Sequence, residues 1–260
     1  MILRRLAEAV RQQEWFTVFL ELIIVVIGIL MALQVDNWNQ ERHARAEAAV
    51  LRQQIINDLY RNREEMQARI HYYDQGLAFA EQALGGLSSE EPPTPDLAWR
   101  TVLGAFQAGQ IWPFQLDSSA FREAQNAGNM AYVADATSLA LLARLYQVTA
   151  YDVELISGGR PKYRDLVRER TPWSIQRHIW NADCQAQSYR GQVIVFELVP
   201  CAAPESEQDI HLAYRTLQAD PEIRYALQGR MSQLRVTSIS FSNSVEQIGK
   251  LIQRLEDSNG

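Results

Sequence analysis

The sequence predicts a mainly α-helical protein, with one N-terminal transmembrane helix followed by an elongated helical bundle that carries a small irregular or hairpin segment. Residues 16–35 form an apolar run that contains a single charge. Residues 40–86 lack proline, and their apolar side chains recur every three or four positions, which is typical of an amphipathic helix. Only the stretch "QVIVFELV" has the pattern of a strand. These observations favour helices throughout the chain, with one short β segment.

The same patterns divide the chain into three parts, with boundaries at changes of composition. We expect a short basic amphipathic tail at 1–14, a transmembrane helix at 15–38, and a mostly helical domain at 39–260. Within that domain the predicted elements are a long helix at 40–86, a helical core at 94–170, an irregular flap at 171–205, and C-terminal helices at 206–258. A cap at Thr94 followed by Pro95 marks the start of the core.

The apolar run is long enough to cross a bilayer. Twenty residues at 1.5 Å each span about 30 Å, which is the thickness of the hydrocarbon layer. A cleaved signal peptide is the alternative, but its apolar region is shorter and ends at small residues, whereas this run ends in "LQVD". Trp15 and Trp38 bracket the run where interfacial aromatic residues belong, and Asn37 lies beside the second of them. We therefore predict an uncleaved anchor.

The orientation of the anchor depends on weaker signals. Basic residues on the two sides of the run are equal in number, although the amino terminus adds one positive charge to the tail. Cys184 and Cys201 are the only cysteines, and they lie 17 positions apart in a segment rich in turn residues. This spacing suits one disulfide in an oxidising compartment, and two unrelated buried thiols are the alternative. Together the signals favour the tail inside and the domain outside.

The stretch "FLELIIVVIGILMALQVDNWNQERHAR" resembles an uncharacterised bacterial membrane-protein family, whose span reads approximately GE(I/L)xLVVxGILIALQ(I/V)NNWNE. Ten positions match, and two depart: Leu20 stands where the family often has glycine, and Asp36 where it often has asparagine. The resemblance implies a bacterial inner-membrane protein with a helical domain, and the orientation above then places that domain in the periplasm. The resemblance brings no known activity.

Glu21 interrupts the apolar run about five residues from its midpoint. A carboxylate at that depth costs a few kcal/mol and usually faces a partner, a cavity or an ion path. Helical spacing places it on one stripe with Val25, Gly28 and Ala32, and the last two form a pair of small residues that lets helices approach closely. We predict contacts within a homo-oligomer. The alternatives are a lone glutamate on a monomeric anchor, and a cation or proton path lined by Glu21 and Gln34.

Other candidate sites are few. A basic cluster can bind an anion or a lipid surface or can be a solvated face, and it comprises Arg160, Lys162, Arg164, Arg168 and Arg170. The four histidines are dispersed, and no zinc-binding, phosphate-loop, dinucleotide or serine-hydrolase motif occurs in the sequence. We therefore predict no metal, no cofactor and no enzymatic activity. The net charge of −6 disfavours nucleic-acid binding.

These observations predict a single-span membrane protein that self-associates and has a structural or interaction role. Its expected partners are the lipid bilayer, further copies of the chain, and another envelope protein. An oligomeric pore with Glu21 in its lining is the first alternative. A periplasmic ligand-binding partner of a sensor is the second, because a tail of 14 residues is too short for an output domain of its own.

Overall fold

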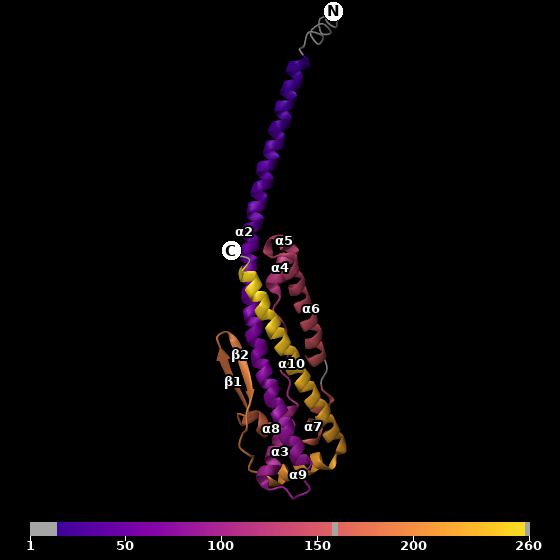
Figure 1. Cartoon of the computed structure of the whole chain (residues 1–260). Helices are drawn as coiled ribbons and strands as arrows, with labels where there is room; N and C mark the ends of the chain where they lie inside the picture. Colours follow the sequence, from indigo (N-terminus) through magenta and orange to yellow (C-terminus); the bar gives the residue numbers. More distant parts are fainter. Residues whose placement is uncertain (1–14, 158–160, 258–260) are drawn as a thin grey trace, which may run out of the picture.

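A computed structural model describes residues 15–157 and 161–257, with the side chains at positions 15–18, 21 and 148–157 excepted. Its longest element is α2 (Trp15–Leu87), a single helix of 73 residues. The first part of α2 projects as a bare stem, and the rest of the chain packs around its second part (Figure 1). The fold is mainly α-helical with a small two-stranded sheet, which confirms the predicted fold class.

The core of the domain is the pairing of α2 with the last helix, α10 (Pro221–Asp257). The two helices run antiparallel, as two hydrogen bonds show. Tyr60 Oη donates to the Glu256 carboxylate at 3.0 Å, and Ser238 Oγ donates to the Asp74 carboxylate at 2.7 Å. The buried side chains of α2 recur at the spacings that the sequence predicted, and they include Ala48, Leu51, Ile55, Leu59, Met66, Tyr73 and Ala80. The helix predicted at 40–86 forms the second part of α2 and is continuous with the apolar run.

Four helices follow α2 along the chain: α3 (Pro95–Ala108), α4 (Ser119–Ala127), α5 (Met130–Val133) and α6 (Ala136–Ser157). Thr94 caps α3 by accepting from the backbone N–H of Leu97 at 3.2 Å, with Pro95 in the first turn as predicted. Asp135 caps α6 by accepting from the N–H groups of Thr137 and Ser138. Gly128 ends α4 in the left-handed conformation, which glycine adopts without a steric cost.

The next elements are α7 (Lys162–Arg170), α8 (Trp173–Asn181), a hairpin of β1 (Gln185–Arg190) and β2 (Val193–Leu198), and α9 (Glu207–Ala219). The strands are antiparallel, with Gln185 opposite Leu198 and Arg190 opposite Val193. Strand β2 lies against α2, whereas α6 lies against α10 on the other side of this pair (Figure 1).

Two details differ from the sequence expectations. The segment predicted as an irregular flap contains the helix α8 as well as the predicted hairpin, because Ile175 and Ile179 lie one turn apart and are both buried. Serine is a poor helix former, so the serine-rich stretch of the last helix predicts a bend. The structure has regular helix there, with the hydroxyls of Thr237 and Ser242 donating to carbonyls four residues earlier. The adjacent glycines Gly158 and Gly159 predict a helix break in the sequence, and they lie outside the described residues.

Candidate functional site: the apolar stem and its connection to the domain

The stem is the most unusual surface of the molecule. Every residue whose burial is described between positions 19 and 38 is exposed, and most are large and apolar. Trp38, at the end of this run, has 64% of its surface exposed. Soluble proteins rarely leave so large a continuous apolar surface in water. Within the described chain, α2 is the helix that is long and apolar enough to cross a membrane.

One face of the stem carries the predicted contact stripe. Val25, Gly28 and Ala32 follow one another at spacings of three and four, so they lie on one side of the helix. A β-carbon added at Gly28 would meet no atom within 4 Å. This face therefore has room for a second helix. The backbone of Glu21 lies on the same side, and its side chain is outside the described residues, as is that of Trp15.

Gln34 lies on a different face from Glu21. Thirteen residues separate the two, and an α-helix turns about 100° per residue, so they stand about 140° apart around the axis. Because α2 is regular helix through both positions, one axial path cannot be lined by both residues of the same helix. The predicted lining of a pore by this pair is therefore not supported by the geometry of the helix.

A short neck joins the stem to the domain. Residues 36–47 are mostly exposed, and the first buried residue after them is Ala48. Asn37, a predicted interfacial residue, is exposed here together with Trp38. Two contacts between residues four apart support the neck: Gln40 Nε2 donates to the Asp36 carboxylate at 2.8 Å, and Arg45 pairs with Glu41 at 3.1 Å. At 1.5 Å per residue the neck is about 18 Å long.

The end of the domain that faces the stem is tied directly to α2. Arg52 donates to the backbone carbonyl of Val133, and its Nη2 donates to that of Tyr132 at 2.8 Å. Asn129 Nδ2 donates to the Glu47 carboxylate at 3.2 Å, and the guanidinium of Arg45 lies 5.7 Å from the centre of the Tyr132 ring. These contacts hold α5 against α2 at the point where the neck ends.

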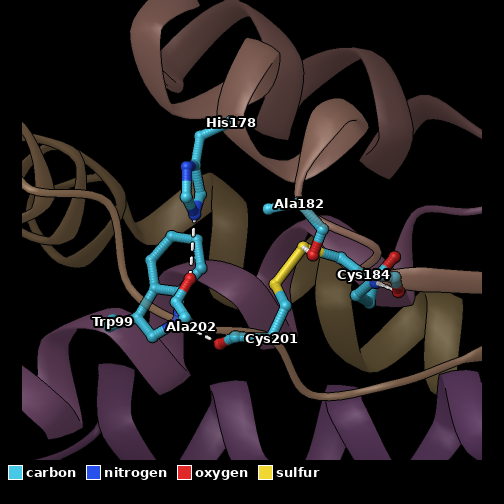
Figure 2. The surroundings of a disulfide bond; sticks show 7 residues. Trp99, His178, Ala182, Cys184, Cys201 and Ala202 are labelled. Atoms are coloured by element: carbon cyan, nitrogen blue, oxygen red, sulfur yellow. Dashed lines mark hydrogen bonds between the residues drawn. A yellow bond between two sulfur atoms is a disulfide. The ribbon is translucent and has the colours of Figure 1, made fainter.

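The two cysteines lie at the base of the hairpin. Cys184, at the start of β1, is joined to Cys201, after β2, by a disulfide (Figure 2). Trp99 Nε1 donates to the Cys201 carbonyl at 2.9 Å, and the His178 ring bonds to the Ala202 carbonyl at 2.8 Å. The two rings meet edge to face with their centres 5.6 Å apart (Figure 2). The disulfide thus closes the base of the hairpin, and the two hydrogen bonds connect the loop after β2 to the helices α3 and α8.

The basic cluster of α7 bonds to the rest of the domain. Arg164 donates to the Gly109 carbonyl at 3.0 Å and to Gln110 Oε1 at 3.1 Å, and Arg168 also reaches Gln110 Oε1, at 3.2 Å. Lys162 and Arg170 both pair with Glu222, and Arg170 also pairs with Asp220. Arg160 lies outside the described residues. The predicted anion- or lipid-binding role of this cluster therefore gains no support from the geometry.

The sequence did not predict that two arginines, Arg69 and Arg230, are buried. Arg69 is held between the rings of Trp112 and Phe114, at 4.2 and 4.5 Å from their centres, and it pairs with Glu65 at 3.2 Å. Arg230 donates to carbonyls at the end of α3. Burial lowers the pKa of both guanidinium groups. No pattern in the sequence separates these arginines from the many exposed ones.

One hollow of the described surface holds about 430 Å³ and is lined mainly by polar residues. Beside it Arg61 bridges Asp58, at 2.6 Å, and Asp117, at 3.2 Å. The hydrogen bond from the Ser119 hydroxyl lowers the pKa of Asp117, so that carboxylate is ionised at neutral pH. General acid catalysis needs a carboxyl whose pKa is raised toward the working pH, and Asp117 has the opposite shift. Among the described residues, no group of three or more His, Cys, Asp or Glu side chains has the arrangement of a metal site.

No protein-family model, curated protein or solved structure matches the chain. The resemblance of the span to an uncharacterised bacterial membrane-protein family therefore stays a prediction.

Proposed function

We propose that this chain is a bacterial single-span inner-membrane protein that self-associates through its stem and holds a helical interaction domain in the periplasm. The observation that carries the proposal is the bare stem, whose apolar side chains contact nothing else in the described molecule. A bilayer of about 30 Å covers this length of helix. The interfacial residues Asn37 and Trp38 then lie at the membrane surface, and the neck separates that surface from the domain.

The disulfide supports the periplasmic placement of the domain. Disulfides persist in oxidising compartments and are rare in the bacterial cytoplasm. The bond between Cys184 and Cys201 lies in the part of the chain that follows the span, and the positive amino-terminal tail lies on the other side. The proposed orientation therefore has the tail in the cytoplasm and the domain outside it.

Thiol labelling tests this placement. In protein taken from cells and denatured without reductant, we expect neither Cys184 nor Cys201 to react with a maleimide, because both sulfurs are in the bond. After reduction, both should react in full. A cytoplasmic copy of the domain, expressed without the span, is the matched control for labelling, since both cysteines are then in a reducing compartment. Free thiols in the full-length protein before reduction would contradict the periplasmic placement.

Self-association is favoured by the composition of the stem. Small residues at helix interfaces let backbones approach closely, and the helix carries two of them, Gly28 and Ala32, on one face. Placing Glu21 on that face in the centre of an assembly removes a carboxyl from lipid. The role that follows is mechanical or adaptor-like: the stem gathers several domains at fixed spacing, and a further envelope component binds them.

The assembly is tested by enlarging one residue of the stripe. In a gentle detergent, wild-type protein is expected to be oligomeric by native mass spectrometry, and Gly28→Leu should weaken association about tenfold, because the side chain holds the helices apart. The matched control is Leu30→Phe, which enlarges a residue on the opposite face and should leave the mass distribution unchanged. A monomeric wild type, or equal loss with both variants, would remove the stripe from the proposal.

A further inference from the structure

A groove between α6 and α10 has a lining rich in cations. It holds about 280 Å³ and is lined by Leu141, Arg144, Gln247, Lys250, Leu251 and Arg254. Three of these six residues are cations, and no carboxylate is among them. The chain as a whole carries a net charge of −6. We call this feature the α6–α10 groove.

The cations of the groove come from both walls. Arg144 stands on α6, whereas Lys250 and Arg254 stand one turn apart on α10. Lys250 is paired with Glu246, one turn earlier on its own helix. Within the described part of the chain, Arg144 and Arg254 form neither a hydrogen bond nor an ion pair. Arg254 interacts electrostatically with the carboxylate of Asp135. That carboxylate also accepts hydrogen bonds from the backbone N–H of Thr137 and the hydroxyl of Ser138, at the start of α6.

Two leucines give the groove an apolar part. Leu251 forms the floor and is 2% exposed, whereas Leu141 on the wall is 38% exposed. A ligand that covers Leu141 would remove apolar surface from water, which is favourable at about 25 cal/mol per Å². Gln247 adds an amide that can donate to an oxygen. Sites that bind small molecules commonly combine apolar walls with a few polar groups of this kind.

The geometry points to a binding site for a small organic anion, with a carboxylate or phosphate head between Arg144 and Arg254 and a short apolar body against Leu141. Arginine forks bind both kinds of head by paired, charge-assisted hydrogen bonds. This site is independent of the proposed self-association, because none of its residues belongs to the stem.

The source of the ligand is the solution and not the bilayer surface, an argument that rests on the proposed span. Glu256 of α10 lies beside Tyr60, and Arg254 and Lys250 lie farther from the stem. Tyr60 follows Trp38 by 22 residues, which is about 33 Å of helix. Electrostatic attraction to headgroups is screened within about 8 Å at physiological salt. The groove is therefore out of reach of lipids in the membrane that anchors its own chain.

Calorimetric titration of the full chain in nanodiscs of zwitterionic lipid tests the site, with empty nanodiscs as the reference. The probes are hexanoate, hexyl phosphate and inorganic phosphate. We expect at least one of the two hexyl anions to bind with one site per chain, and inorganic phosphate to bind at least tenfold more weakly than hexyl phosphate. Arg144→Gln and Arg254→Gln should each weaken the hexyl anion about tenfold, because each removes a charge-assisted contact.

The matched control is Arg224→Gln, which removes an exposed cation of α10 outside the groove and should leave the affinity unchanged. Equal affinities for hexyl phosphate and inorganic phosphate would overturn the apolar part of the site. No saturable binding of either hexyl anion, or affinities in the two groove variants equal to wild type, would overturn the site as a whole. The Gly28→Leu protein should bind the hexyl anion as the wild type does, whether or not it self-associates, so the two proposals can fail separately.

Discussion

Replacing Arg230 with alanine is expected to destabilise the domain by about 3–5 kcal/mol. The side chain is only 4% exposed, and it donates from Nε to the Ala108 carbonyl at 3.0 Å and from Nη2 to the Gln110 carbonyl at 2.8 Å. These carbonyls lie at the C-terminal end of α3, where the helix dipole is negative and favours a cation. Alanine would leave both carbonyls without their donor and would open a cavity between α3 and α10.

The measurement is chemical unfolding of the full-length protein in nanodiscs, followed by tryptophan fluorescence. Arg235→Ala is the matched control, because Arg235 lies on the exposed side of the same helix and has no hydrogen bond or ion pair among the described residues. Its expected change is within about 0.5 kcal/mol. Similar unfolding midpoints for the two variants would show that the hydrogen bonds from Arg230 to the two carbonyls make no net contribution to the stability of the domain.

Gly104→Ala is expected to destabilise the domain by about 2–3 kcal/mol, although alanine is ordinarily the better helix former. A β-carbon at Gly104 would stand 2.7 Å from the backbone oxygen of Phe79 and 3.3 Å from the backbone nitrogen of Ala83. Phe79 and Ala83 belong to the last turns of α2, and their backbone atoms cannot rotate away as a flexible side chain can. The helix α3 would have to move outward, which would loosen the packing of α2 against α3.

Gly229→Ala is the matched control for that substitution. Gly229 lies inside α10, and an added β-carbon there meets nothing within 4 Å. This variant should gain about 0.5–1 kcal/mol from the lower entropy of its unfolded chain. Opposite changes in the unfolding midpoint therefore support a close approach of α2 and α3 at Gly104. A gain in stability in both variants would show that the backbones of α2 and α3 are farther apart at Gly104 than this structure indicates.

The long elements of this fold were accessible from the sequence because each has a periodic apolar face. The helix at 40–86 and the terminal helix both show spacings of three and four, and Thr94 with Pro95 carries an explicit start signal. The helix α8 escaped because it has nine residues and only Ile175 and Ile179 in the core. Two apolar residues in a polar segment give too short a periodic pattern to distinguish a helix from a loop.

The candidate site residues also differ in whether the sequence could predict them. The stem stripe follows from helical spacing alone, because a bare helix has no tertiary context that alters the positions of its faces. The α6–α10 groove could not be predicted, since Arg144 and Arg254 are 110 positions apart and come together only when α6 and α10 pack side by side. The basic cluster is the converse case. Its charges are adjacent in sequence, but internal carbonyl, amide and carboxylate groups bind them.

The pairing of the first long helix with the last has a consequence for how the chain folds. Tyr60 and Glu256, which meet across that pair, are 196 positions apart. At a synthesis rate of about 5–20 residues per second, the apolar side of α2 stays exposed for roughly 10–40 s before α10 has been synthesised. Contacts between such distant positions also form slowly, because a long loop must close first. In a nascent chain the apolar side of α2 therefore stays exposed until α10 has been made, and any early stop before α10 leaves that side uncovered and prone to aggregation.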